Sequence, residues 1–366
     1  FVVNNSVFVD GGVTTSGNGT SLEQAFKSIQ EAIDGAVHCD MILVADGTYT
    51  GPNNRNIDFA GKAIHLKSIN GALNCIIDCQ RSGRGFYFHS GEIATSIVEG
   101  FTIRNGEIDG AGGGVYASSS PTIKDCIITG NTAHSYGGGI YLSSSSALIT
   151  GCSVTNNTTN QAGGGVYLSN SSATLNNCII TNNVGDGSSY GSGGGVYFNS
   201  SHAVLNGCLI ADNTSRMNGA GTCLYISNPT LNNCTIANNS ATGNGGAFNC
   251  HDSNPTLNNS IIWSNTASAG NQINGYGSSR ITLNYCDYAD NSVATNNISA
   301  SVTSNNCMIL NPLFINVGGG NYQLQAASPC KDAGLNSYIL GIITVDANKN
   351  PRIVNGVVDF GAYEYQ

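Results

Sequence analysis

A cysteine, or a residue standing in its place, returns at a nearly constant interval along the middle of this chain, and this period limits the possible folds most strongly. The members are Phe101, Cys126, Cys152, Cys178, Cys208, Cys234, Ser260 and Cys286. Their spacing is roughly 26 residues, and a fixed period of this size is typical of repeat proteins. We therefore expect one elongated domain, in which each repeat buries its apolar side against its neighbours.

An asparagine follows these positions, from Cys126 onward, at a constant offset of five residues. The asparagines are Asn131, Asn157, Asn183, Asn213, Asn239, Asn265 and Asn291. Asparagine tolerates the left-handed backbone angles of tight bends, and stacked asparagine side chains bond to one another. We expect the periodic cysteines to point inward as small apolar side chains, and the asparagines to form a structural column at one bend.

Each repeat contains three short strand-like segments separated by bends. One repeat runs through 165–168, 173–175 and 178–181, with a glycine-rich bend before the first segment. Glycine permits tight corners that have no side chain. Three strands in every repeat predict an all-β solenoid in which each repeat forms one coil of a parallel β-helix.

The two ends of the chain depart from the repeat. Near the start, Ser21 and Gln24 form a capping-box pattern, and Gly35 is a suitable stop. Helical spacing connects four apolar residues in between: Leu22, Phe26, Ile29 and Ile33. This pattern predicts an amphipathic helix that covers the first open layer of the core. We expect an N-terminal strand and helical cap over 1–40, a parallel β-helix over 41–310, and a C-terminal capping module with β structure over 311–366.

The chain has few charges, and its balance is acidic. Charged residues make up only 10% of it, hydrophobic residues make up 40%, and the formal net charge is -9. Nucleic acids and anionic membranes both attract basic surfaces, so this balance argues against either partner. No run of about 20 apolar residues is present, and we expect no membrane span. The opening at Phe1 shows no signal peptide, which is typical of a processed mature terminus or a trimmed chain.

Six of the 13 cysteines lie outside the periodic column, which Cys307 extends. They are Cys39, Cys75, Cys79, Cys223, Cys250 and Cys330. We consider them candidates for one or two disulfides. Cysteines that stack in phase project in parallel, which is unfavourable for disulfide geometry. The short Cys-x2-Cys spacing of metal sites is missing, so the column does not indicate metal binding.

The sequence resembles a known superfamily. The segment Val98-Glu99-Gly100-Phe101-Thr102-Ile103-Arg104-Asn105-Gly106 and the Gly-Gly-Gly-Val-Tyr repeats are similar to right-handed parallel β-helices of the pectate-lyase-like superfamily. The tail, with Asn311-Pro312-Leu313-Phe314 and Val358-Asp359-Phe360-Gly361-Ala362-Tyr363, resembles a C-terminal module of secreted bacterial surface proteins, which is associated with anchoring. The resemblance implies a right-handed β-helix in a secreted, extracellular or cell-surface protein. It leaves the activity open, because one fold hosts many functions.

Candidate catalytic groups are concentrated in the early coils. The residues that would serve a polysaccharide lyase as base or neutralising cation are Arg81, Arg84, His89 and Arg104. A solvated polar face of paired charges is the alternative interpretation. The later repeats lack the two or three clustered carboxylates that a glycoside hydrolase requires.

The tail contains one weak calcium candidate. Asp346, Asn348 and Asn350 alternate as oxygen-bearing residues, as in a calcium-binding loop. Lys349 occupies the place where such a loop prefers glycine, so a capping hairpin is the competing interpretation. No other cofactor is indicated.

These patterns favour a non-catalytic extracellular rod for adhesion or assembly. The alternatives are a polysaccharide lyase or glycoside hydrolase with a site on the early coils, and a carbohydrate-binding surface protein without turnover. The expected partners are cell-surface or matrix glycans, or copies of the chain itself end to end. Residues 1–9 are apolar enough to pair with an open sheet edge of another copy, which would build filaments.

Overall fold

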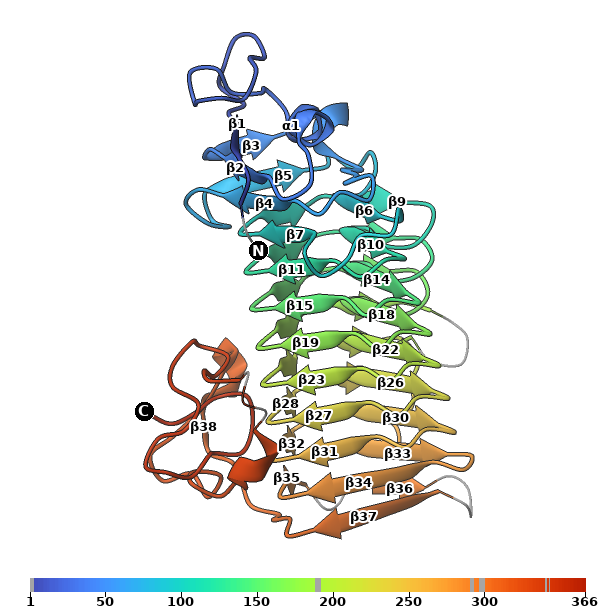
Figure 1. Cartoon of the computed structure of the whole chain (residues 1–366). Coiled ribbons are helices and arrows are strands. Elements are labelled where there is room, and N and C mark those ends of the chain that lie inside the picture. Colours follow the sequence, from blue (N-terminus) through green and yellow to red (C-terminus); the bar gives the residue numbers. More distant parts are fainter. Residues whose placement is uncertain (1–2, 188–191, 290–292, 296–299, 340, 342) are drawn as a thin grey trace.

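The protein is a straight stack of coils with a small C-terminal module at its side (Figure 1). This computed structural model describes all residues except 1–2, 188–191, 290–292, 296–299, 340 and 342. Four parallel sheets run along the stack, with 12, 10, 9 and 6 strands, and we name them sheets A, B, C and D in that order. The architecture confirms the predicted right-handed parallel β-helix, with almost no helix.

Sheet A comprises β1 (Ser6–Val9), β2 (Met41–Val44), β4 (His65–Ser68), β7 (Ile97–Glu99), β11 (Thr122–Lys124), β15 (Leu148–Thr150), β19 (Thr174–Asn176), β23 (Val204–Asn206), β27 (Thr230–Asn232), β31 (Thr256–Asn258), β34 (Arg280–Asn284) and β37 (Ser301–Asn305). Sheet B comprises β3 (Gly47–Tyr49), β5 (Cys75–Asp78), β8 (Thr102–Arg104), β12 (Ile127–Thr129), β16 (Ser153–Thr155), β20 (Ile179–Thr181), β24 (Leu209–Ala211), β28 (Thr235–Ala237), β32 (Ile261–Trp263) and β35 (Asp287–Tyr288).

Sheet C comprises β6 (Phe86–Phe88), β10 (Val115–Ala117), β14 (Ile140–Ser143), β18 (Val166–Ser169), β22 (Val196–Asn199), β26 (Thr222–Tyr225), β30 (Phe248–His251), β33 (Ile273–Tyr276) and β36 (Val293–Thr295). Sheet D comprises β9 (Glu107–Ile108), β13 (Thr132–Ala133), β17 (Thr158–Thr159), β21 (Val184–Gly185), β25 (Thr214–Ser215) and β29 (Ser240–Ala241). The remaining elements are α1 (Ile29–Gly35), η1 (Pro52–Asn54), β38 (Phe314–Asn316), η3 (Val317–Gly319), β39 (Asn321–Leu324) and η4 (Asn336–Tyr338).

Each central coil passes through sheets A, B, D and C in turn. The three predicted strands are those of sheets A, B and C, and sheet D adds a strand of two residues that the sequence analysis did not anticipate. Successive strands pair in parallel and in register, as where Ser153 lies beside Ile179. The period of the sequence therefore corresponds to one complete coil of roughly 26 residues.

The periodic cysteines form a buried column between sheets A and B. Cys126, Cys152, Cys178, Cys208, Cys234 and Cys286 are each at most 1% exposed. The amide of Ile179 donates to the carbonyl of Cys152, which places the cysteines of neighbouring coils one above the other. All 13 cysteines are free thiols, so the disulfides expected among the six cysteines outside the column are absent.

The periodic asparagines form a second buried column between sheets B and D. Nδ2 of each asparagine donates to Oδ1 of the next at 2.8–3.1 Å, through Asn131, Asn157, Asn183, Asn213, Asn239 and Asn265. Nδ2 of Asn265 ends the chain of bonds by donating to Oε1 of Gln272 at 2.6 Å. The column confirms the structural role predicted for these residues. Asn291 lies outside the described residues.

The N-terminal cap has a shorter helix than predicted. Helix α1 begins at Ile29, with Oε2 of Glu31 accepting from the amide of Ser28, rather than near Ser21. The capping pattern at Ser21 forms only a local turn, because Phe26 pairs with β1 instead of continuing a helix. Leu22 remains 42% exposed, whereas Ile29 and Ile33 are buried on the core side of α1.

Strand β1 is paired on both sides. It lies parallel to β2, and its outer edge bonds the following segment: the amide of Phe8 donates to Gly19, and the carbonyl of Phe8 accepts from Phe26. The described part of the N-terminal segment therefore offers no free strand edge at β1 for another copy. This pairing argues against filament growth through residues 1–9.

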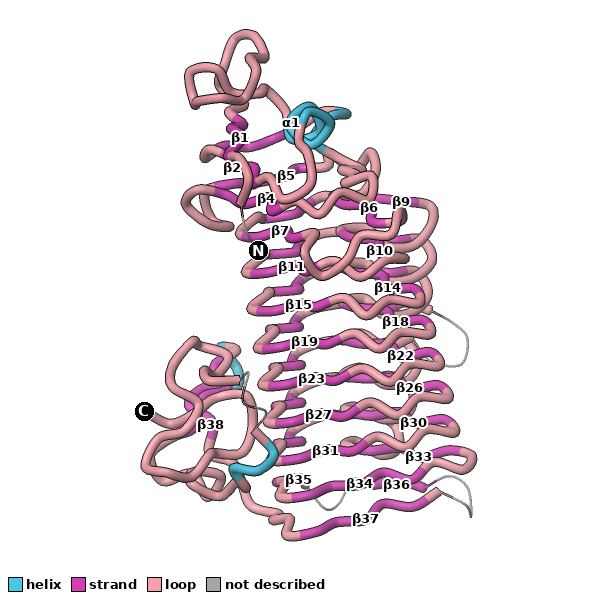
Figure 2. The backbone as a smooth tube through the Cα atoms, in the orientation of Figure 1, coloured by secondary structure: helices cyan, strands magenta, loops and turns pink. Residues whose placement is uncertain are grey.

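The C-terminal segment folds back along the rod instead of crossing its end. The trace of Figure 2 shows this module, residues 311–366, beside the coils of β19 to β35. Its apolar side chains, including Phe314 and Phe360, pack on Leu209, Ala237 and Ile261 of sheet B. The module thus covers a flank, which corrects the expectation of a terminal cap.

Within the described residues, no helix is long and apolar enough to cross a membrane.

Candidate functional site

The four basic residues predicted as lyase candidates do not form one site. Arg104 projects from sheet B and pairs with Asp78 at 3.0 Å. Arg81 pairs with Glu107 of sheet D at 3.3 Å. The other two, Arg84 and His89, lie near each other on sheet C. Because the coil turns through several faces within this short stretch, closeness in sequence did not bring these groups together.

Arg84 and His89 both contact the first ring of a tyrosine stack. The guanidinium of Arg84 lies 4.5 Å from the ring centre of Tyr87, and the imidazole of His89 lies 4.1 Å from it. Arg84 also donates to the carbonyls of Ala111 and Gly112, and Nε2 of His89 lies 3.2 Å from Asp58. Burial lowers the pKa of the Arg84 guanidinium. The arrangement holds a loop and caps the stack.

The tyrosine stack itself uses its ring faces internally. Neighbouring ring centres lie 4.9–5.4 Å apart along Tyr87, Tyr116, Tyr141, Tyr167 and Tyr197. Sugar rings dock on exposed aromatic faces. From Tyr116 to Tyr197 the neighbouring rings are stacked face to face, whereas Tyr87 meets Tyr116 edge to face. Most ring faces are therefore occupied by the neighbouring ring. The stack stabilises sheet C and is a poor sugar platform.

A different charged row, which the sequence analysis did not identify, lies on the outer face of sheet A. Glu99 is at its centre, within 3.0 Å of His65, 3.2 Å of Lys67 and 3.3 Å of Lys124. The row continues to Asp125, whose carboxylate lies 2.9 Å from Nζ of Lys349 in the C-terminal module. The cluster around Glu99 could have been found from the sequence, because β4, β7 and β11 occupy equivalent places in successive coils. The contact between Asp125 and Lys349 could not, because no repeat relates these two residues.

The lysines make this row net positive in a protein of net negative charge. Burial by itself would raise the pKa of Glu99, but hydrogen bonds and charge from Lys67 and Lys124 hold it below its usual value. Burial also lowers the pKa of His65, which favours the neutral imidazole. Three lysines against two carboxylates leave a charge of about +1.

Below the charged row, sheet A presents two regular columns of polar side chains. The motif Thr-Leu-Asn recurs at 174–176, 230–232, 256–258 and 282–284, with Val-Leu-Asn at 204–206. The leucines are buried in the core, so threonine and asparagine lie on the outer face. Nδ2 of each asparagine donates to Oδ1 of its predecessor at 2.8–2.9 Å, along Asn176, Asn206, Asn232, Asn258, Asn284 and Asn305.

We call these two columns the Thr-Asn array. Stacking leaves most of its amides buried, as with Asn206 and Asn258. The threonines, such as Thr230 and Thr256, are half-buried and carry most of the accessible hydroxyl groups. The asparagine column thus keeps the outward residues of successive coils, four threonines and Val204, in register.

The C-terminal module stands beside this array. Asn177, Asn233 and Asn259, at the corner between sheets A and B, donate to backbone carbonyls of the module. At the upper edge of the contact, a cleft of about 370 Å³ lies between the rod and the module. Its walls include Lys124, Asn177 and Ser153 from the rod. Val345 and Lys349 from the module complete it. The array, the module and the cleft between them therefore adjoin one another on this side of the rod.

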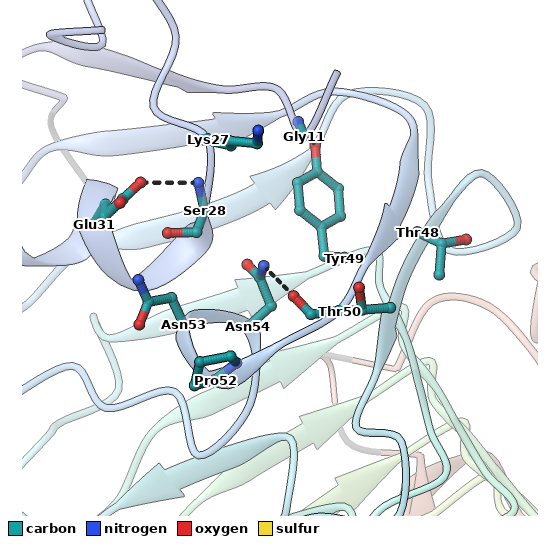
Figure 3. Close-up of a pocket in the computed structure, with 10 residues that line it drawn as sticks. All are labelled: Gly11, Lys27, Ser28, Glu31, Thr48, Tyr49, Thr50, Pro52, Asn53 and Asn54. Carbon is teal, nitrogen blue, oxygen red and sulfur yellow. Dashed lines mark hydrogen bonds between the residues drawn. The ribbon is translucent and has the colours of Figure 1, made fainter. Parts of the chain in front are cut away.

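A second pocket, of about 310 Å³, lies at the N-terminal cap (Figure 3). Several of its polar groups hydrogen-bond within the cap. Asn54 accepts from the amide of Ile29 and donates to the carbonyl of Thr50, and the hydroxyl of Tyr49 donates to Ala45. These bonds join α1 and η1 to the first coils. The pocket is therefore a by-product of the cap.

The weak calcium candidate in the tail does not assemble a cation site. Asp346 is fully buried, and its two oxygens accept from the backbone amides of Asn348, Asn350 and Glu364. A carboxylate that satisfies three amides stabilises a turn. Across the described part of the chain, no group of three or more metal-ligating side chains is arranged for a metal ion.

Comparison with known proteins agrees with this architecture. A family model described as the right-handed beta helix region matches residues 41–199. The crystal structure of pectate lyase Pel9A aligns with a TM-score of 0.64 and 14% identity, covering 100% of this chain and 98% of that chain. ORF18 of Geobacillus virus E2 aligns with a TM-score of 0.39 and 14% identity, covering 82% of this chain and 59% of that chain. No curated protein matches the sequence. At so low an identity, the match to pectate lyase reports the fold and assigns no residue.

Proposed function

We propose that this protein, a right-handed parallel β-helix with the fold of the pectate-lyase-like superfamily, is a non-catalytic extracellular rod that binds a glycan along the outer face of sheet A. The Thr-Asn array is the observation that carries this proposal. It offers a threonine hydroxyl in four of the five coils from 174 to 284, with Val204 in the remaining coil, on a backing of stacked amides, beside a wall formed by the C-terminal module. A linear polysaccharide repeats its hydroxyl groups in the same way along one axis.

The distribution of charge supports binding without turnover. The candidate acids and bases of the early coils are paired on separate faces, as with Arg104 and Asp78 on sheet B and Arg81 and Glu107 near sheet D. Hydrolysis of a glycoside requires two carboxyl groups flanking one bond. The outer face of sheet A presents Glu99 and Asp125, and lysines contact both of them. Low charge over the rest of the face suits an uncharged or weakly charged glycan.

The array can be tested without changing the core. Thr230 and Thr256 are half-buried on sheet A, and replacing both by valine removes two hydroxyls while keeping the side-chain shape. We expect affinity for a glycan selected on a polysaccharide array to fall about tenfold, as two lost hydrogen bonds imply.

The matched control replaces Thr129 and Thr155 by valine on the uncovered face of sheet B. Its affinity should stay within about twofold of the parent protein, since one hydrogen bond is worth more than that. Equal losses in both variants, or no retention of any neutral or acidic polysaccharide, would reject the proposal.

The second candidate function is a polysaccharide lyase that uses the charged row of sheet A. Lys67 and Lys124 converge on Glu99, and a lyase needs a base together with positive charge near the substrate carboxylate. The solved structure of a pectate lyase with the same fold supports this alternative. Unsaturated products, detected by ultraviolet absorbance and abolished by Lys124→Ala, would favour it over simple binding. Loss of activity in Arg84→Ala or His89→Ala would instead assign chemistry to sheet C.

A further inference from the structure

The two ends of the rod differ in how they are closed. At the N-terminal end, α1 buries Ile29 and Ile33 over the first coil, and both edges of β1 carry hydrogen bonds. At the other end, sheet A stops at β37, with no further strand among the residues described. The C-terminal module, which was expected to close this end, lies on the flank.

The backbone groups along the open edge of β37 can be identified. The amide of Ser301 donates to Ser279, and the carbonyl of Asn305 accepts from Tyr285, so these residues direct their backbone groups toward β34. Alternate residues of a strand direct their backbone groups to opposite sides. Val302 and Ser304 therefore present their N–H and C=O groups to the open edge.

This edge lacks the features that normally prevent strand pairing. Natural edge strands carry charges or proline, or are covered by other elements. The segment 300–311 contains no charged residue and no proline. Side chains of β37 are exposed except for half-buried Val302, and the neighbouring Ile309 and Leu310 are 48% and 53% exposed. Among the described residues, no strand pairs with the outer edge of this uncharged strand.

We propose that this end pairs with the same end of a second copy, giving a tail-to-tail dimer about a two-fold axis. An edge strand is complementary to itself when one copy is turned by half a revolution, because donors then meet acceptors in an antiparallel ladder. Centred on Thr303, the pairing places Val302 opposite Ser304 of the second copy and makes four backbone hydrogen bonds. Sheet A then runs continuously through both rods, and Ile309 and Leu310 lose solvent exposure.

The occupant is a second copy because the closed N-terminal end excludes head-to-tail growth. A head-to-tail contact would need a free edge at β1, where Phe8 is already bonded to Gly19 and Phe26. An isologous contact between two identical ends closes after one step and cannot propagate. The dimer does not depend on glycan binding, and the two proposals can fail separately.

Ser304→Pro tests the pairing with little change to the coil. Proline removes the outward amide of residue 304, and edge strands tolerate proline on that side. Light scattering with chromatography should give a dimer for the parent protein and a dissociation constant about tenfold to a hundredfold weaker for the variant, since each copy loses one donor. Ser304→Ala keeps the amide, loses only the hydroxyl contact with Tyr288, and should remain as dimeric as the parent.

Amide hydrogen exchange provides the second measurement. The backbone amides of Val302 and Ser304 should exchange slowly in the concentrated parent protein and quickly after dilution. In a Val302→Pro variant, the amide of Ser304 should exchange quickly even in concentrated solution. A monomer at all concentrations would overturn the proposal. So would a dimer that Ser304→Pro leaves intact, or larger assemblies that grow with concentration.

Discussion

The outer face of sheet B has two regions, which differ in sequence and in whether the C-terminal module covers them. In the upper coils it presents Thr129, Thr155 and Thr181, which are half-buried and face solvent. In the lower coils the same column continues as Ala211 and Ala237, which are fully buried beneath the C-terminal module. The backbone is the same in both regions. The comparison teaches that a β-helix of constant geometry can receive a partner domain wherever its outward residues change from polar to small and apolar.

The substitution with the largest expected effect places a charge beneath the module. Ile261 is 1% exposed and packs in the cluster that joins the module to sheet B. We expect Ile261→Asp to release the module or lower the free energy of unfolding by roughly 4 kcal/mol, because a buried unpaired carboxylate is costly. Limited proteolysis of residues 311–366 and urea unfolding would show the effect.

The control lies on the uncovered region of the same sheet. Thr129→Asp changes a half-buried residue of β12 that does not line the cleft, and it should alter the free energy of unfolding by about 0.5 kcal/mol or less. Similar proteolysis of both variants would mean that the module is not held by the lower coils.

We expect pH to change the free energy of unfolding by a smaller amount, and in opposite directions for carboxyl groups in the two regions. Asp287 of β35 is fully buried where the module meets the lower coils, and its carboxylate accepts from the amide of Leu310 and the thiol of Cys330. Burial raises the pKa of Asp287 to about 6. A raised carboxyl pKa means that the folded state holds the proton more tightly. This contribution to stability is complete below about pH 4 and is lost as the pH rises through 6.

We therefore expect the module to loosen by about 2 kcal/mol between pH 4 and 7, measured by proteolysis or urea unfolding across that range. Asp287→Asn should remove part of this slope, while Glu364, whose pKa burial raises to about 7, retains the rest. The carboxyl of Glu99, on coils that the module does not cover, has a lowered pKa, so its contribution to the stability of the folded state is lost as the pH falls. An unchanged slope in Asp287→Asn would assign the pH dependence elsewhere.

The smallest effect concerns the corners of the coil. Asn259 has a positive φ of 48°, and its side chain exchanges two hydrogen bonds with the backbone of Leu335 in the module. Asn259→Gly keeps the backbone conformation and loses both bonds, which should lower the free energy of unfolding by about 1–2 kcal/mol. Asn156→Gly, at an exposed corner with φ of 56°, should change it by a few tenths of a kcal/mol. Equal thermal shifts would show that the module contact at this corner contributes nothing.

Periodicity in the sequence was sufficient to predict the coil and two of its columns. The cysteine and asparagine series differ by a constant offset, and that offset corresponds to one bend of the coil. Two further columns had the same signal and were missed. The Thr-Leu-Asn motif forms the array on sheet A. The serines that bond each coil to the next in the interior are Ser145, Ser171, Ser201, Ser227, Ser253 and Ser279.

The sequence by itself determined the stacking, because identical spacing places like residues above one another and parallel strands keep that register. Only the tertiary structure decided where the non-repeating parts lie. No period relates Lys349 to Asp125, or Tyr322 to Asp212, yet both pairs hold the module to the flank. The same limit explains why the early basic residues did not gather: position around a coil depends on each bend, and spacing in sequence does not report it.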